Sequence, residues 1–351
     1  MLSRKNLLVF NYCMDLEDPL LSHQVEAVNE LSKYYEKVTV ITGRIGPHAV
    51  SSNVRIVSSN WIAGKPIESG LNFVLTATKV ILRNRNIVVF SHMTEVQSAM
   101  LCLPLRIFGI PHYLWYAHTY KSVFLTLNHF FVNGIITSTK GSCPIKSKKV
   151  FPVGQAINFD NFERSDKSII AIRDLVHIGR FDQSKNISEI IDTVKNVKNN
   201  QKLVLTFTQI GSPTTKVAHS YYALVHEKFV QEIKEGWIKL KPSIFRSEVP
   251  SILREYDAFL HAYNGSLDKS IVEATFVGIP VLTTNPEYLA IFGSWARQPQ
   301  DSVTLENELQ AILNMQIIDI TKKLEKRRII AIQGHSLNNW ALQISKILTK
   351  D

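Results

Sequence analysis

Short apolar runs that alternate with longer amphipathic segments are the feature of this 351-residue sequence that most constrains its fold. In the first half, residues 7–10, 38–42 and 87–91 have the length and composition of buried strands. Segments with apolar residues at helical spacing lie between these runs. Strands that alternate with helices indicate parallel βαβ units, so the sequence predicts an α/β protein.

The second half repeats this alternation, with apolar runs at 175–178, 203–210 and 258–261. A chain of this length suits two domains of ordinary size. We therefore predict two doubly wound, Rossmann-like domains that face each other across a cleft, at residues 1–160 and 161–351. Helices from about residue 305 are expected to close the chain, with the last helix packing back on the first domain.

The stretch 257–284 is the part of the sequence that says most about function. It reads as a strand at 258–261, a polar turn, a helix at 269–277 and a second strand. Gly278 lies where a helix C-cap favours positive φ. A turn that leads from a strand into a helix is where open α/β sheets bind ligands, and the helix N-terminus suits a phosphate. Glu273, about one turn into the helix, is expected to face the same crevice and accept hydrogen bonds from sugar hydroxyls.

The run S-L-D-K-S-I-V-E-A, followed by G-I-P-V, resembles the donor-sugar motif of the family-4 glycosyltransferases, which are retaining enzymes of the GT-B fold. That motif has two acidic residues eight positions apart. Glu273 takes the place of the second, and the first falls on Gly265. The segments W-Y-A-H, V-F-P-V-G-Q-A-I-N-F-D-N-F and G-R-F-D-Q-S-K-N-I resemble other parts of the family in the same order. The resemblance covers nearly the whole chain and implies the GT-B fold.

Two cations, Arg180 and Lys185, bracket the turn after the predicted strand 175–178, and Ser184 is expected to cap the helix that begins near Asn186. Cations beside a helix N-terminus suit a diphosphate. The resemblance implies that both cations neutralise the donor diphosphate as it leaves. Taken alone, the same pattern is also typical of a solvated basic turn.

The start of the helix at 269–277 supplies the rest of the predicted donor site. Asp268, Lys269 and Ser270 lie in its first turn, ahead of Glu273. Two structural interpretations remain open here, because Asp268 also suits an N-cap and Glu273 also suits the helix dipole. We predict donor contacts from Arg180, Lys185, Asp268, Lys269, Ser270 and Glu273.

Histidines near predicted strand ends are the candidates for the acceptor side. His118 follows the predicted strand 113–116, and the resemblance implies that it contacts the transferred sugar. His92 has a similar placement, and His23 opens the first predicted helix. We expect Arg180, Lys185, Glu273 and His118 to be the catalytic residues. Two further histidines, His177 and His261, lie within predicted strands and are expected to be buried and structural.

No residue pattern in the sequence suggests a metal or a cofactor. The three cysteines show no metal-ligand spacing, and Asp15, Glu17 and Asp18 fit no calcium loop. We expect a metal-independent enzyme without a cofactor, whose donor substrate is a nucleotide-diphospho-sugar. The cysteines are expected to be reduced thiols of a cytoplasmic protein.

Positive charge is concentrated in the first half of the chain. The net charge is +10, and residues 1–160 hold 16 Lys and Arg against 9 Asp and Glu. Residues 71–85, apolar first and then basic at Lys79, Arg83 and Arg85, are compatible with a helix lying on an anionic membrane and with an ordinary core helix. Scattered cations argue against a nucleic-acid binder. We expect a protein without a spanning segment or signal peptide, with peripheral association at the inner membrane face.

Taken together, these features predict a retaining glycosyltransferase of hexosyltransferase type. It would move a sugar from a nucleotide-diphospho-sugar to a glycan or lipid-linked acceptor, as in bacterial surface-polysaccharide assembly. The alternative is a catalytically silent GT-B-like partner or scaffold subunit, which Gly265 in the place of an acid favours. The absence of G-x-G-x-x-G after any predicted strand argues against a dinucleotide-dependent oxidoreductase.

Overall fold

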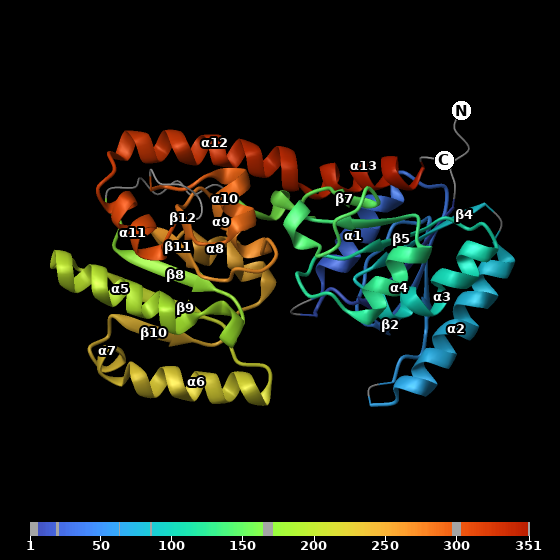
Figure 1. The fold of residues 1–351 in the computed structure, drawn as a ribbon, viewed down its shortest axis with the longest axis horizontal. Coiled ribbons are helices and arrows are strands. Elements are labelled where there is room, and N and C mark those ends of the chain that lie inside the picture. Colours follow the sequence, from blue (N-terminus) through green and yellow to red (C-terminus); the bar gives the residue numbers. More distant parts are fainter. Residues whose placement is uncertain are drawn as a thin grey trace. The chain divides into compact units, whose positions relative to one another are not determined.

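The computed structural model describes residues 6–18, 21–62, 64–84, 86–163, 171–296 and 303–349. The chain divides into two compact units, each built on one parallel sheet (Figure 1). Unit 1 comprises Met1–Asn158 and Gly334–Asp351, and unit 2 comprises Phe159–Gln333. The division falls two residues before the predicted boundary. Residues 334–351, predicted as part of the second domain with the last helix packing back on the first, belong to unit 1.

Unit 1 contains a seven-stranded parallel sheet in the order β3-β2-β1-β4-β5-β6-β7. Strand β1, between β2 and β4, has buried side chains on both faces, which is why it reads as an unbroken apolar run rather than an alternating one. The strands are β1 (Asn6–Met14), β2 (Val38–Ile45), β3 (Val54–Ser58), β4 (Ile87–His92), β5 (His112–Trp115), β6 (Gly134–Thr137) and β7 (Val150–Pro152).

Helices supply the other side of three cores in unit 1: α1 (His23–Ser32), α2 (Pro66–Arg83), α3 (Glu95–Ile107), α4 (Val123–Phe131) and α13 (Leu337–Leu348). Residues of α1 and α13 share one core with the sheet, including Val28 and Trp340. Residues of α2 and α3 share another, in which the rings of Phe10 and Phe73 meet edge to face at 5.0 Å. The sequence did not predict α4, whose apolar residues lie on both its buried and its exposed sides.

Unit 2 contains a five-stranded parallel sheet in the order β10-β9-β8-β11-β12. Its strands are β8 (Asp174–Ile178), β9 (Thr206–Ile210), β10 (Ile238–Lys241), β11 (Ala258–His261) and β12 (Val281–Thr283). Its helices are α5 (Ile187–Gln201), α6 (Lys216–Lys228), α7 (Val230–Lys234), α8 (Val249–Leu253), α9 (Lys269–Val277), α10 (Pro286–Phe292), α11 (Leu305–Leu313) and α12 (Ile317–His335), whose last two residues belong to unit 1. Helices α6 and α7 follow each other directly and meet at Phe229.

The order of the strands in unit 2 determines where a site can form. Strand β11 lies between β8 and β12, all three run parallel, and their carboxyl ends therefore share one edge of the sheet. The turns after these strands are thereby brought together. Helix α9 has the predicted bounds, and it ends at Gly278, whose φ of 95° is the left-handed conformation expected of a C-cap glycine.

None of the described helices combines the length and the apolar character needed to cross a membrane.

Candidate functional site

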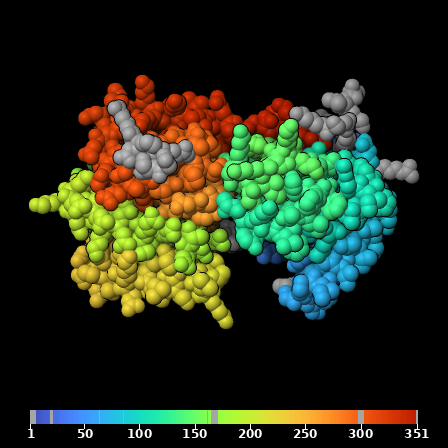
Figure 2. Space-filling model, in the orientation of Figure 1, coloured from blue at the N-terminus to red at the C-terminus, as the bar shows by residue number. Residues whose placement is uncertain are grey.

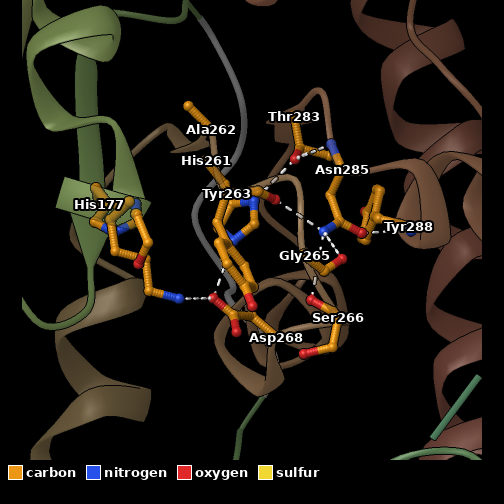
Figure 3. A network of polar contacts seen from close by, with 12 residues as sticks. His177, His261, Ala262, Tyr263, Gly265, Ser266, Asp268, Thr283, Asn285 and Tyr288 are labelled. Carbon is orange, nitrogen blue, oxygen red and sulfur yellow. Dashed lines mark hydrogen bonds and ion pairs between the residues drawn. The ribbon is translucent and has the colours of Figure 1, made fainter. Parts of the chain in front are cut away.

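A network of polar contacts occupies the carboxyl edge of the unit 2 sheet, and Asp268 lies at its centre (Figure 3). Its Oδ2 is 2.5 Å from Nζ of Lys185 and 3.1 Å from Nε2 of His261. Asp268 holds the N-cap position of α9, but its side chain makes no capping hydrogen bond. The carboxylate is instead turned toward Lys185 and His261, so the simple capping interpretation does not describe it.

Hydrogen bonding and charge keep the Asp268 carboxylate ionised. Burial alone would raise its pKa, but the hydrogen bond from His261 and the positive charge of Lys185 outweigh burial and lower the pKa. His261 is fully buried, and that burial lowers its own pKa, which favours the neutral ring. The ionised Asp268 carboxylate can only accept, so Nε2–H of His261 donates to it. In the neutral ring Nδ1 then accepts from the Thr283 hydroxyl, which lies 2.9 Å away. His261 is thus buried, as predicted, and it also positions the carboxylate.

Lys185 lies in the short 3₁₀ helix η3 (Gln183–Lys185) and is only 8% exposed. Its Nζ is 4.0 Å from the centre of the Tyr263 ring, so a cation–π contact adds to the ion pair with Asp268. Asn186 follows in the left-handed conformation and donates from Nδ2 to the Ala262 carbonyl at 2.9 Å. The contacts of Lys185 with the Tyr263 ring and of Asn186 with the Ala262 carbonyl therefore anchor this turn to the end of β11.

The beginning of the same turn differs from the predicted arrangement. Ser184 does not cap α5, which begins at Ile187; instead Ser184 donates from its backbone N–H and its hydroxyl to the carboxylate of Asp182. These two hydrogen bonds lower the pKa of Asp182. Arg180 lies two residues before Asp182, so both predicted cations belong to one turn. Arg180 is exposed to solvent, whereas Lys185 is nearly buried.

Tyr263 occupies the space that a side chain at position 265 would need. A Cβ atom added to Gly265 would lie 2.0 Å from the Tyr263 hydroxyl oxygen. The turn itself is held by the buried amide of Asn285, which donates to the carbonyls of Tyr263 at 2.8 Å and Gly265 at 3.2 Å (Figure 3). The Tyr263 ring, which fills the place of the motif's first acid, therefore also makes the cation–π contact with Lys185.

We expect Gly265→Glu to destabilise the protein by about 1–3 kcal/mol, because the new side chain overlaps Tyr263. The double variant Gly265→Glu with Tyr263→Ala should recover at least half of that loss. Free energies of unfolding of both single variants and the double variant measure this coupling. Additive losses would mean that Tyr263 does not fill the place of the acid.

Glu273 is fully buried, which corrects the expectation that it faces the crevice. Both of its carboxylate oxygens accept from the guanidinium of Arg246, one at 3.0 Å and the other closer. Arg246 begins the 3₁₀ helix η4 (Arg246–Glu248), and its side chain is 39% exposed. The sequence offered no signal for Arg246, because it begins a single 3₁₀ turn 27 positions from its partner.

The remaining predicted donor residues, Lys269 and Ser270, lie in the first turn of α9 and are partly exposed. They follow Asp268 directly, so the start of α9 and the turn 179–186 meet through the Lys185–Asp268 pair. The structure thus brings Lys185 and Asp268 into contact at the start of α9, with Tyr263 against the first and His261 against the second.

The predicted acceptor-side histidines all belong to unit 1 and have different environments. His118 is exposed after β5, with its ring 5.5 Å from that of Tyr116. His23 is partly exposed at the start of α1. His92 is only 4% exposed and stacks on Phe90 within an aromatic cluster that includes Trp115 and Trp340. His92, predicted on the acceptor side, is therefore buried in the core.

The acidic loop after β1 serves local contacts. Asp18 pairs with Arg44, and Asp15 accepts from the backbone N–H of Glu17 at 2.9 Å. Among the residues that the structure describes, no three or more His, Cys, Asp or Glu side chains lie together in a way that would hold a metal ion.

Two parallel-sheet, Rossmann-like units with helices that close the chain define the GT-B fold, as the sequence predicted. No protein-family model matches the chain, and no curated protein sequence does.

Solved structures match over nearly the whole chain. HepE of Anabaena, in complex with UDP and glucose, has a TM-score of 0.74 and 14% identity, over 99% of this chain and 100% of that one. Sucrose-phosphate synthase of Thermosynechococcus elongatus has a TM-score of 0.73 and 13% identity, over 98% of both chains. A glycosyltransferase of Rickettsia africae has a TM-score of 0.69 and 12% identity, over 99% of this chain and 100% of that one. At these identities the likeness establishes the fold.

Proposed function

We propose that the protein is a glycosyltransferase that uses a nucleotide-diphospho-sugar, of the retaining family-4 type. The observation that carries this proposal is Lys185, a nearly buried cation held by Asp268 and the Tyr263 ring beside the first turn of α9. An ammonium has three N–H groups, and within the described part of the chain Asp268 is its one hydrogen-bond acceptor. The donor diphosphate would take the others.

In this proposal catalysis comes from charge that is already in place. The leaving diphosphate gains negative charge in the transition state. Cations and N–H groups that point at this charge therefore stabilise the transition state more than the ground state. Lys185 is fixed by two partners and needs little reorganisation, whereas Arg180 is exposed and would close on the phosphate. The N–H groups in the first turn of α9, at Lys269 and Ser270, would complete the phosphate contacts. We infer front-face transfer, in which the leaving phosphate assists the incoming hydroxyl.

The Arg246–Glu273 pair has a different proposed role from the one the motif implies. Because Glu273 is buried and both of its carboxylate oxygens accept hydrogen bonds from Arg246, we infer that it orients the guanidinium. The exposed part of Arg246 would then meet the donor in place of the carboxylate. Glu273 would act as a positioning residue.

For the acceptor, we propose a glycan or a lipid-linked glycan held by unit 1. His118 is the exposed histidine of the predicted set and the better candidate for contact with the transferred sugar, with His23 beside the acceptor. His92, packed in its aromatic cluster, would support this side of the unit indirectly. The domain roles, with unit 1 for the acceptor and unit 2 for the donor, belong to the same proposal.

The experiment is a thermal-shift screen of UDP-, GDP- and ADP-sugars, followed by a hydrolysis assay of the sugar that binds. UDP-glucose is the first candidate, because a HepE structure contains it. The proposal predicts a raised melting temperature with one nucleotide and slow hydrolysis without an acceptor. A silent partner subunit is the second candidate function, favoured by Tyr263 filling the place of the first acid. Binding without hydrolysis or transfer would support that second candidate.

We expect turnover to persist in excess EDTA, because the proposed phosphate contacts are cations and backbone N–H groups. The measurement compares initial rates with and without the chelator. Full loss of activity that manganese or magnesium restores would contradict this expectation.

A further inference from the structure

We propose that the exposed side of α2, α3 and α4 in unit 1 docks on an anionic lipid bilayer. We call it the α2–α4 surface, which consists of the exposed residues of 66–83, 95–108 and 120–131. The proposal deepens the proposed function and rests on it, because a lipid-linked acceptor embedded in a bilayer would require the enzyme to bind there. The sequence pointed only to residues 71–85, of which Arg85 lies outside the described residues.

Helix α2 presents an apolar stripe to solvent. Its inner side packs into the sheet core through Phe73 and Ala77. Its outer side carries large apolar residues at intervals of four, four and seven positions, which keeps them on one side of a helix. These are Ile67, Leu71, Leu75 and Leu82, exposed by 79%, 60%, 58% and 78%. Both sequence interpretations therefore apply to α2, since it covers the sheet and also offers an apolar side to a partner.

Helices α3 and α4 extend this stripe into a broad surface. Their most exposed apolar residues are Ile107 at 71%, Phe108 at 77%, Val123 at 82% and Phe130 at 69%. Single exposed apolar residues are ordinary, but a contiguous group with a polar border marks an interaction site.

The three helices are in direct contact. A Cβ on Gly70 of α2 would lie 2.9 Å from Met100 Cε of α3. Asn128 of α4 donates to the Glu95 carbonyl of α3 at 2.9 Å. In Figure 2 the light-blue to green atoms of these segments form one continuous part of the surface.

The charge on and around this surface is mainly positive. Between residues 66 and 159 the sequence has nine Lys and Arg and two acidic residues, Glu68 and Glu95. Glu68 is exposed at the start of α2, where it pairs with Lys65 at 3.1 Å. The Glu95 carboxylate accepts from Ser122 Oγ between α3 and α4 and is thus engaged within the protein. Four of the cations are exposed on these helices or at their ends: Lys79, Arg83, Arg106 and Lys121. Apolar residues bordered by cations match the acyl chains and headgroups of an anionic bilayer.

Other partners fit this surface less well. A second copy of the chain, docked through a twofold axis, would bring the cations of both copies together. A nucleic acid would use the cations through its phosphates but would gain little from a row of aliphatic side chains. A bilayer uses both features at once.

The test is co-sedimentation with vesicles of neutral phosphatidylcholine and with vesicles that also contain phosphatidylglycerol, at low and high salt. We expect binding to the anionic vesicles, weakened by salt, with about a fivefold gain in partition for each cation near the surface. No binding to anionic vesicles at low salt would overturn the proposal.

Two double variants separate the two features of the surface. Leu71→Gln with Leu75→Gln removes apolar contacts, and Arg106→Glu with Lys121→Glu reverses charge. Each should lower the partition at least tenfold. The controls make the same chemical changes on unit 2, where Leu224 on α6 is 64% exposed and Lys322 on α12 is also exposed. Leu224→Gln and Lys322→Glu should bind as the wild type does.

Three outcomes of the variant experiment would contradict the bilayer assignment. In the first, the double variants bind vesicles as the wild type does. In the second, the leucine variant alone binds normally while soluble heparin competes, which indicates a polyanion site. In the third, the wild type is a dimer that the leucine variant dissociates with unchanged vesicle binding.

A thermal shift with the nucleotide-sugar keeps the two proposals apart. Donor binding should persist in all of these variants, because none touches unit 2 near Lys185. Normal donor binding without vesicle binding would remove the membrane proposal alone. Vesicle binding without any donor response would remove the proposed function and leave a membrane-associated protein.

Discussion

Replacing Lys185 with alanine is expected to lower nucleotide-sugar turnover by about a hundredfold or more. The substitution removes charge-assisted contacts to the diphosphate, each worth about 1.5–3 kcal/mol. It also leaves the Asp268 carboxylate without its ammonium partner, where it would repel the incoming phosphates. Initial rates at saturating donor measure the effect. Lys228→Ala is the matched control, because Lys228 also pairs with an aspartate of unit 2, Asp192, but in an exposed position.

A second variant shows whether the loss comes from catalysis or from folding. Breaking a largely buried ion pair by removing one partner costs about 3–5 kcal/mol, so Lys185→Ala is expected to lower stability as well. Lys185→Met with Asp268→Asn removes both charges while filling the space, and it should recover much of the melting temperature. Turnover should stay low in this double variant. Recovery of turnover together with stability would show that Lys185 has a structural role only.

The second large effect is expected at Glu273. Glu273→Gln keeps the shape of the side chain but removes the charge that binds Arg246 on both oxygens. Because the Arg246 side chain is 39% exposed and water can solvate it, we expect a loss of about 2–4 kcal/mol rather than the full cost of a buried charge. Equilibrium denaturation measures this loss.

Donor affinity tells the two roles of Glu273 apart. If Glu273 orients Arg246 toward the donor, Arg246→Ala should weaken donor binding at least as much as Glu273→Gln does. A strong effect of Glu273→Gln combined with normal binding in Arg246→Ala would mean that the carboxylate itself contacts the donor, as the motif implies. Arg254→Ala is the control, because it removes an exposed pair with Glu163 in the same unit.

Much of the fold could be predicted from local sequence patterns. Helix α9 has the predicted bounds, and Gly278 ends it with the positive φ that a C-cap requires. These features depend on neighbouring residues, which is why they can be read from one segment. Helix α4 was not predicted because four of its nine residues are large, apolar and exposed, so its amphipathic pattern is weak. The exposed apolar residues of α4 therefore obscure the helical periodicity of its sequence.

The details of the site depended on residues that are distant in sequence. Glu273 pairs with Arg246, and Lys185 pairs with Asp268 across 83 positions. Single-sequence patterns place such side chains near the right edge of the sheet, because parallel strands end there, but not in contact. The collision between Tyr263 and a side chain at position 265 is likewise visible only once the turn has a conformation. His92 shows the same limit, since its burial depends on Trp340 from the far end of the chain.

The central claim is that Lys185 and its partners at the carboxyl edge of unit 2 bind the diphosphate of a nucleotide-sugar. Isothermal titration of the wild type and of the Lys185→Met, Asp268→Asn double variant with UDP-, GDP- and ADP-sugars tests it most directly. We predict that one nucleotide-sugar binds the wild type and that the double variant binds it at least tenfold more weakly, with the fold confirmed by melting temperature. Absence of binding by all three, or equal affinity in the wild type and the double variant, would contradict the claim.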